Sequence, residues 1–271
     1  MSNSYFQFKQ FTIQQDRCAM KVTTDGCLFG AWVAEKAVSK EPGVASRESL
    51  GAGMPVLVDN IFEVVDDDNN KNIKIRILDI GTGTGLLTLM VAQKSKCLAD
   101  AVEIDNDAFE QAKENVQSSP WSERIHVIRA DANVFNSARN YDIIISNPPF
   151  YENELKSPDK RKNIAHHGGL RLKELMGVIH NNLAEDGEYF LLLPYKRYDE
   201  AEKLINSNKL SITEKILVRQ SIDHDFFRVM IRGSHAKEKN CTLTSELSIR
   251  DDRQQYTPGF IDLLKDYYLR L

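Results

Sequence analysis

The sequence predicts an α/β protein built on a mainly parallel sheet, because apolar strands and helical segments alternate without a linker from Ile75 to about Arg232. Short apolar runs bounded by turn residues are typical of buried strands in such a sheet. We predict the first four strands at 77–80, 100–105, 125–132 and 141–146. We predict helices at 86–94, 107–117, 172–183 and 199–207. A fifth strand at 189–193 and a closing pair at 210–218 and 226–231 complete the pattern.

The first strand runs into a glycine-rich turn, Gly81-Thr82-Gly83-Thr84-Gly85, and then into a helical pattern. Glycines permit tight backbone angles and a close approach of a ligand to the main chain. A dinucleotide fingerprint would read G-x-G-x-x-G, and Leu86 stands where its third glycine should be. The loop therefore favours a smaller nucleoside cofactor with a charged amino-acid tail over a pyrophosphate cofactor.

Acidic residues stand at the carboxyl ends of the next two strands. Glu103 follows the glycine loop at roughly the twenty-residue offset at which an acid reaches ribose hydroxyls. Asp131 ends the third strand. Together with the glycine loop, the two acids predict a nucleoside-binding edge.

The fourth strand ends in Asn147-Pro148-Pro149-Phe150. Proline has no N–H and a fixed φ, so the turn is rigid. The Asn147 amide oxygen and the Pro148 carbonyl are two neighbouring acceptors, as an exocyclic amino group requires, and Phe150 offers a flat face for a ring. We assign these four residues the catalytic role. A plain Pro-Pro turn at a strand end is the alternative interpretation of this tetrapeptide.

With these motifs in this order, the chain resembles the class I S-adenosylmethionine-dependent methyltransferases, and in particular the bacterial tRNA1(Val) (adenine-37-N6)-methyltransferase family. An Asn-Pro-Pro-(Tyr/Phe) motif after strand four marks the branch that methylates amino groups on planar targets. The resemblance extends outside the core to residues 6–11, 16–22, 24–26, 119–121, 124–125, 256–260 and 267–269. It implies a Rossmann-like, mainly parallel seven-stranded sheet with helices on both faces.

The resemblance assigns the glycine loop to the methionine part of S-adenosylmethionine, Glu103 to its ribose and Asp131 to its adenine. The full set of cofactor-binding residues expected is Lys21, Thr24, Asp79, Gly81, Gly83, Gly85, Glu103, Asp131, Ala132 and Asn147. The expected substrate-binding residues are Arg17, Phe150, Tyr151, Lys156, Lys160, Arg161 and Lys162. The basic members of the second set flank the expected adenine pocket and are candidates for phosphate contacts.

We expect a single methyltransferase domain over residues 1–271. Within it, residues 1–30 form an N-terminal segment near the active site, 39–72 a loop-rich insertion and 75–232 the catalytic core. The insertion is longer than the family resemblance suggests. The net charge of −4 disfavours a general nucleic-acid binder, so the local basic residues matter more.

Cysteine usage and hydropathy indicate the cellular compartment that we expect for this protein. Its four cysteines, Cys18, Cys27, Cys97 and Cys241, form no C-x-x-C pair and no zinc-spaced cluster, so we expect reduced thiols and no metal. No run is long or apolar enough to cross a membrane, and no signal peptide is evident. We expect a cytoplasmic protein that binds tRNA, with a monomer favoured.

The function we predict is N6-methylation of an adenine in tRNA, adenine 37 of tRNA1(Val) by the resemblance. Two alternatives use the same chemistry, a glutamine N5 protein methyltransferase and an rRNA adenine-N6 methyltransferase. Other classes are an NAD-dependent oxidoreductase, which the missing third glycine disfavours, and a non-catalytic nucleotide-binding module. The latter would not need Asn147 and Phe150 together.

Overall fold

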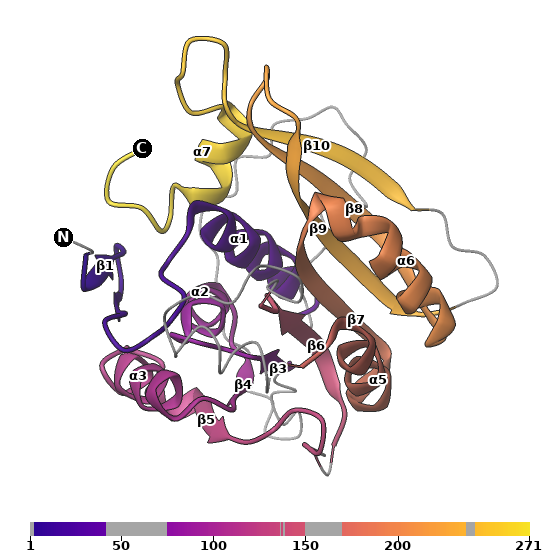
Figure 1. Cartoon of the computed structure of the whole chain (residues 1–271). Coiled ribbons are helices and arrows are strands. Elements are labelled where there is room, and N and C mark those ends of the chain that lie inside the picture. The colour runs from indigo at the N-terminus through magenta and orange to yellow at the C-terminus, as the bar shows by residue number, and fades with distance from the viewer. Residues whose placement is uncertain (1–2, 42–74, 136, 138, 150–169, 237–241) are drawn as a thin grey trace, which may run out of the picture.

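The computed structural model describes residues 3–41, 75–135, 137, 139–149, 170–236 and 242–271, and within them the central feature is an eight-stranded sheet (Figure 1). Its strand order is β10-β8-β9-β7-β6-β3-β4-β5. The strands are β3 (Arg76–Ile80), β4 (Leu98–Glu103), β5 (Ile125–Arg129), β6 (Tyr141–Ser146), β7 (Leu183–Pro194), β8 (Leu210–Ser221), β9 (Phe226–His235) and β10 (Leu243–Arg250). The first strand, β3, lies between β4 and β6, so the winding direction reverses there. A crevice at the carboxyl ends of the strands is expected at this reversal.

The sheet confirms the predicted mainly parallel architecture and adds a strand to the seven expected. Strands β3 to β7 pair in parallel, and among the described strands of this sheet only β9 runs against its neighbours β7 and β8. The additional strand, β10, pairs in parallel with the outer edge of β8. Because β8 extends to Ser221, beyond the predicted end at 218, it offers a long row of free backbone groups that β10 can satisfy.

Helices cover both faces, as predicted. They are α1 (Thr24–Ser39), α2 (Leu86–Lys94), α3 (Asn106–Gln117), α5 (Leu172–Asn182), α6 (Tyr198–Ser207) and α7 (Pro258–Leu264), with short 3-10 turns η2 (Ser122–Arg124) and η3 (Tyr195–Arg197). Successive strand residues belong to opposite halves of the core. In β6, Ile143 and Ile145 pack on the side of α1 and α2, whereas Ile144 packs on the side of α5 and α6 (Figure 1).

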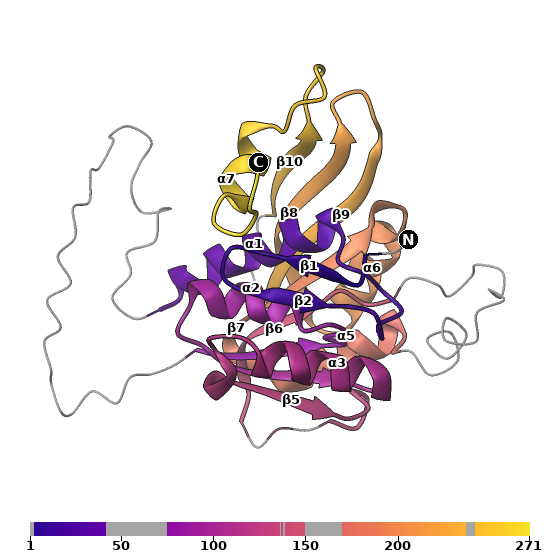
Figure 2. The ribbon, with the colours of Figure 1, turned by 90° about the vertical axis from the view of Figure 1, so that its left-hand side faces the viewer.

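The N-terminal segment returns to the sheet as a small hairpin of β1 (Tyr5–Gln7) and β2 (Thr12–Gln14). Figure 2 shows this hairpin beside α3. The buried Asn115 amide of α3 accepts from the Gln14 backbone N–H at 2.9 Å and donates to the Gln14 carbonyl at 2.8 Å. It also donates to the Thr84 carbonyl at 2.9 Å, which links the hairpin to the glycine loop. The C-terminal tail joins the same region, since the Lys9 backbone N–H donates to the Tyr267 carbonyl at 2.8 Å.

Helix α1 begins with a side-chain cap. The Thr23 side chain accepts from the Gly26 backbone N–H at 3.2 Å, which satisfies one of the free donors of the first turn. The expected 39–72 insertion lies outside the described residues from position 42 onward.

We predict that Gly233→Ala in β9 destabilises the fold by roughly 1–3 kcal/mol. A Cβ there would lie 2.2 Å from the Ser211 carbonyl oxygen and 2.3 Å from the Tyr189 ring carbon Cζ and hydroxyl. Tyr189 is fully buried and its hydroxyl donates to that same carbonyl, so it cannot move aside cheaply. The matched control is Gly177→Ala in α5, where a Cβ meets no atom of the described chain within 4 Å. It should stabilise the helix by about 0.5–1 kcal/mol. Urea unfolding curves measure both effects, and coincident curves for Gly233→Ala and wild type would refute the prediction.

Candidate active site

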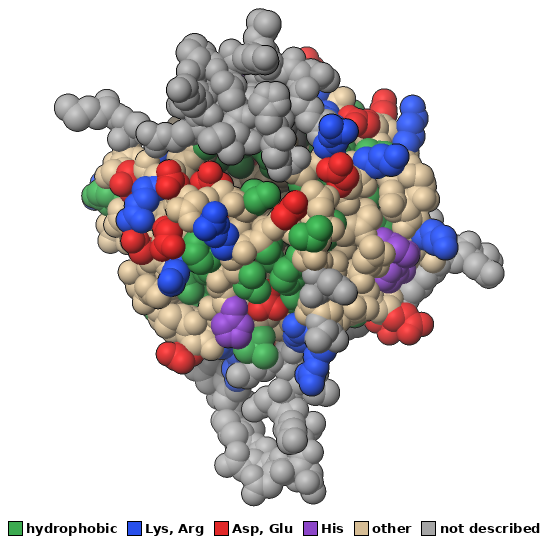
Figure 3. All heavy atoms as spheres, turned by 60° about the horizontal axis from the view of Figure 1, so that its bottom comes forward, with side chains coloured by type: hydrophobic (Ala, Val, Ile, Leu, Met, Phe, Trp, Pro, Cys, Tyr) green, Lys and Arg blue, Asp and Glu red, His purple; other side chains and the backbone are tan. Residues whose placement is uncertain are grey.

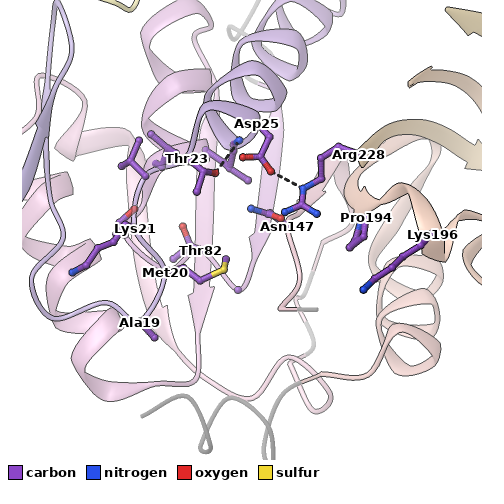
Figure 4. Close-up of a pocket in the computed structure, with 17 residues that line it drawn as sticks. Ala19, Met20, Lys21, Thr23, Asp25, Thr82, Asn147, Pro194, Lys196 and Arg228 are labelled. Atoms are coloured by element: carbon purple, nitrogen blue, oxygen red, sulfur yellow. Dashed lines mark hydrogen bonds and ion pairs between the residues drawn. The ribbon is translucent and has the colours of Figure 1, made fainter. Parts of the chain in front are cut away.

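A pocket of about 370 Å³ lies at the carboxyl ends of β3 and β6, where the chain order predicted a crevice (Figure 4). Its walls come from four parts of the chain: residues 19–23 and 25–26 of the N-terminal segment, the glycine loop, Asn147, and the group Pro194, Lys196 and Arg228. The volume is in the range of small-molecule sites. A site assembled from segments so far apart depends on the fold rather than on any one motif.

The glycine loop presents bare backbone to this pocket. Gly81, Gly83 and Gly85 have φ values of +72°, +58° and +82°, which L side chains rarely adopt. A Cβ built on Gly81 or Gly83 meets no atom of the described residues within 4 Å, whereas one on Gly85 packs 3.8 Å from Ala112. Gly81 and Gly83 thus border open space in the pocket, and Gly85 supports α3.

Asp79 at the end of β3 fixes the shape of this loop. It is fully buried, and the hydroxyls of Thr82 and Thr88 each donate to its Oδ2 atom at 2.7 Å. No described residue donates to its buried Oδ1 atom. Burial raises the pKa of the Asp79 carboxyl to about 6, against the opposing effect of the threonine hydrogen bonds. The loop therefore rests on a carboxylate that retains one acceptor without a donor.

Glu103 reaches the same loop from β4. Its Oε2 accepts from the Gly83 backbone N–H at 2.9 Å, and its Oε1 accepts from the Ile104 and Asp105 N–H groups at 2.9 Å. Burial raises the pKa of the Glu103 carboxyl, while these backbone donors oppose the rise. Asp131 lies beyond β5 and accepts from the Asn133 N–H at 2.9 Å. The structure thus brings Glu103 into contact with the glycine loop. None of Glu103, Asp131 and Ala132 lines the pocket itself.

Asn147 follows β6 and faces the pocket. The Ser146 hydroxyl donates to the Ile80 carbonyl at 2.9 Å, so the ends of β6 and β3 are tied together. The Asn147 Oδ1 atom is buried, and no described residue donates to it. Pro148, the next residue, is buried. The expected contacts of Phe150, Tyr151, Lys156, Lys160, Arg161 and Lys162 lie outside the described residues.

The three N-terminal residues predicted for the site differ in their positions relative to the pocket. Lys21 lines the pocket, and its ammonium donates to the Gln15 carbonyl. Thr24 begins α1, and the pocket wall is made instead by its neighbours Thr23 and Asp25. Arg17 lies on the surface in an ion pair with Glu114 at 2.6 Å. A phosphate contact by Arg17 would have to compete with that carboxylate.

Sequence reasoning did not identify the wall opposite the glycine loop. Arg228 of β9 pairs with Asp25 of α1 through Nε and Oδ2 at 2.6 Å, and Figure 4 shows this pair above Asn147. The two partners are 203 positions apart in the chain. Asp25 belongs to a segment that the family resemblance had singled out, but Arg228, Pro194 and Lys196 belong to no motif. No local pattern could have marked them, because antiparallel pairing of β9 with β7 brings them to the pocket.

The described surface carries both signs of charge. On the face in Figure 3, Lys and Arg side chains are interspersed with Asp and Glu. The part of the chain that the structure describes contains no group of three or more His, Cys, Asp or Glu side chains able to hold a metal ion. Among the same residues, no helix is long and apolar enough to cross a membrane.

We predict that Asp79→Asn changes the pH dependence of stability. The folded-state pKa, about 6, exceeds the unfolded value of about 4, so folding favours the protonated form. The stability that Asp79 contributes is therefore complete below pH 4 and is lost as the pH rises through 6, by roughly 3 kcal/mol in total. Asparagine does not titrate. Between pH 4 and pH 7, the unfolding free energy of the variant should therefore rise relative to that of wild type, by up to about 3 kcal/mol.

Denaturant unfolding at several pH values measures this difference. Asp225→Asn, which removes an exposed carboxyl in the β8–β9 turn, is the control and should follow the wild-type curve. Parallel curves for Asp79→Asn and wild type would contradict the prediction.

Solved structures of low sequence similarity share this fold. A protein predicted to be an O-methyltransferase from Agrobacterium tumefaciens superimposes with a TM-score of 0.56 at 18% identity, over 71% of this chain and 89% of that one. A protein classed as a class I S-adenosylmethionine-dependent methyltransferase from Listeria monocytogenes gives a TM-score of 0.56 at 14% identity, over 86% of this chain and 67% of that one. These similarities confirm the predicted fold class.

Sequence comparison is more specific. The methyltransferase small domain family matches residues 35–188. The chain is 38% identical over 273 residues to a protein from Dyadobacter fermentans named tRNA1(Val) (adenine(37)-N6)-methyltransferase, covering 99% of this chain and 98% of that protein. A protein of the same name from Parabacteroides distasonis is 36% identical over 277 residues, with full coverage of both chains. With such relatives aligned along its whole length, the chain belongs to the tRNA1(Val) (adenine(37)-N6)-methyltransferase family.

Proposed function

We propose that this protein transfers a methyl group from S-adenosylmethionine to the exocyclic N6 atom of adenine 37 in tRNA1(Val). The names of the full-length relatives support the substrate. The observation that carries the chemistry is the buried Asn147 Oδ1 atom, an acceptor without a described donor in a pocket beside the glycine loop. A buried acceptor without a donor costs free energy, so a ligand that donates to it is favoured.

The described residues fit S-adenosylmethionine. Gly81 and Gly83 leave space for a ligand against the backbone, since no atom of the part of the chain that the structure describes lies within 4 Å of a Cβ built there. Two buried carboxylates, Asp79 and Glu103, adjoin the loop and suit a cationic ligand. We propose that the loop, these two acids and Lys21 hold the cofactor, with Asp131 and Ala132 at its adenine. When bound, S-adenosylmethionine supplies an electrophilic methyl group on a positively charged sulfur.

The chain's own role is to orient the target nitrogen. An adenine stacked in a strand cannot present N6 to the pocket, so the base must be turned out of the stack. Asn147 Oδ1 and the Pro148 carbonyl then accept the two N6 hydrogens, which draws the nitrogen lone pair out of conjugation with the ring. Their dipoles also stabilise the positive charge that develops on N6 as the new bond forms. The extra proton can leave to water afterwards, so no adjacent base is required.

A direct test is methylation of an unmodified tRNA1(Val) transcript with radiolabelled S-adenosylmethionine. A transcript with guanine in place of adenine 37 is the substrate control and should stay unlabelled. Parallel reactions with rRNA and with a glutamine-containing protein pool address the two related chemistries. Labelling of the protein pool without labelling of tRNA would overturn the proposed substrate.

The cofactor prediction compares two glycines of the same loop. Gly83→Ala and Gly85→Ala both place a side chain at a positive φ, which costs roughly 1–2 kcal/mol in each case. Only Gly83 lines the pocket, whereas the Cβ at Gly85 packs near Ala112. We expect Gly83→Ala to weaken binding of S-adenosylhomocysteine far more than Gly85→Ala does, with similar losses of thermal stability. Calorimetric titration measures both affinities, and equal affinities would remove the glycine loop from the proposed cofactor site.

The catalytic prediction concerns Asn147→Ala. Loss of one preorganised polar group should reduce the single-turnover rate by roughly 10²–10³-fold. Asn147→Asp keeps an acceptor and should retain more activity than alanine. Affinity for S-adenosylhomocysteine should be nearly unchanged, because the side chain contributes little to the core. Asn140→Ala, at the exposed amino end of the same strand, is the matched control and should keep wild-type activity. Wild-type turnover in Asn147→Ala would mean that the tetrapeptide is only a turn.

A further inference from the structure

Beyond Asn147, the pocket lining includes residues to which we have assigned no role in cofactor binding. In Figure 4, Asn147 lies between Thr82 of the glycine loop and a second group formed by Pro194 and Lys196. Pro194 pairs in register with Arg228 across β7 and β9, so this second wall is one continuous surface. The glycine loop and this second wall therefore lie on opposite sides of Asn147.

An aromatic pair stands next to this wall. Tyr195, between the two lining residues Pro194 and Lys196, is 39% exposed. Its ring meets the edge of Phe226 at 5.6 Å between centroids and 63° between planes. Phe226 begins β9 and pairs with Arg219 of β8, across a shift in the pairing register from Arg228. Phe226 thus packs against the Tyr195 ring.

Positive charge accompanies the rings. The Arg219 guanidinium lies 5.2 Å from the Phe226 centroid and is held there by Ser248 at 2.8 Å and Glu246 at 3.0 Å. Lys196 is exposed, and no described carboxylate pairs with it. We call Tyr195, Lys196, Arg219 and Phe226 the aromatic-basic rim.

The combination fits one kind of ligand. Single-stranded nucleic acids are bound by cations that contact phosphates and by aromatic rings on which bases stack. The exposed turn between β8 and β9 carries Asp223 and Asp225, whose charges repel phosphates. A strand that leaves the pocket is therefore directed over Tyr195 and Lys196 rather than over the tip of this turn.

We propose that the aromatic-basic rim binds the nucleotide next to the methylated adenine in a single-stranded RNA loop. The Lys196 ammonium contacts a backbone phosphate, and the Tyr195 ring stacks on the neighbouring base. Phe226 and Arg219 hold Tyr195 in place and are positioning residues. This subsite rests on the proposed function, since it assumes that the acceptor at Asn147 is a base turned out of an RNA strand.

The test measures binding and methylation of the tRNA1(Val) transcript by Lys196→Ala and Tyr195→Ala. Lys196→Ala should weaken tRNA binding and reduce the slope of log affinity against log salt by about 0.7, the value of one phosphate contact on a single strand. Lys203→Ala removes an exposed lysine from the following helix α6 and is the matched control, with an unchanged slope expected. Tyr195→Ala should weaken binding by roughly 5- to 150-fold, whereas Tyr195→Trp, which preserves a stacking face, should restore it.

The rim should affect substrate capture more than chemistry. For both alanine variants we expect a raised KM for tRNA, little change in kcat and an unchanged affinity for S-adenosylhomocysteine. If wild type methylates the transcript but Lys196→Ala and Tyr195→Ala bind it as wild type does, the rim assignment is wrong and the proposed function stands. If wild type labels no tRNA, the proposed function fails and the rim proposal fails with it.

Discussion

Two threonine hydroxyls donate to one oxygen of a fully buried carboxylate, and the shape of the whole site follows from that contact. Thr82 lies in the glycine loop and Thr88 in the first turns of α2, so Asp79 ties strand, loop and helix together. Because every second residue of the loop is glycine, ordering it would otherwise cost much conformational entropy. Glu103 adds a second restraint from β4 by accepting from the Gly83 N–H. The loop backbone is thereby held open toward the pocket by two carboxylates that lie behind it.

The N-terminal segment forms one wall of the pocket because several contacts hold it against the edge of the sheet. Asn115 joins the β1–β2 hairpin to the glycine loop through the Gln14 and Thr84 carbonyls. The ion pair of Asp25 with Arg228 holds the start of α1 to β9. At the other end of α1, Lys36 pairs with Glu214 of β8 at 2.9 Å. These ion pairs are largely shielded from water, so removing one partner leaves a poorly solvated charge on the other.

The position of Asn147 gives the pocket two functional halves. Behind it, Ser146 fixes the end of β6 to β3, so the amide cannot drift from the glycine loop. On one side lie the glycine loop and the N-terminal segment, and on the other lie Pro194, Lys196 and Arg228. A reaction between a cofactor and a large planar acceptor needs this arrangement, because both must reach one point from opposite directions.

Features encoded within a short stretch of chain could be predicted from the sequence. Helix α2 has the predicted bounds 86–94. The glycine loop, Glu103 and Asn147 all occupy the carboxyl edge of the sheet, because strand periodicity and turn residues are local properties.

Other features were decided only by the tertiary structure. The addition of β10 depends on the free edge of β8, and Arg228 reaches the site only because β9 pairs against β7. The N-terminal segment was recognised in the sequence, yet the pocket uses Thr23 and Asp25 rather than Thr24, since helix rotation sets which side chains face inward. The sequence by itself determined the core strands β3 to β7, the glycine loop and the acceptor motif. Folding alone determined the opposite wall, because a contact between residues 203 positions apart leaves no pattern in the chain around either one.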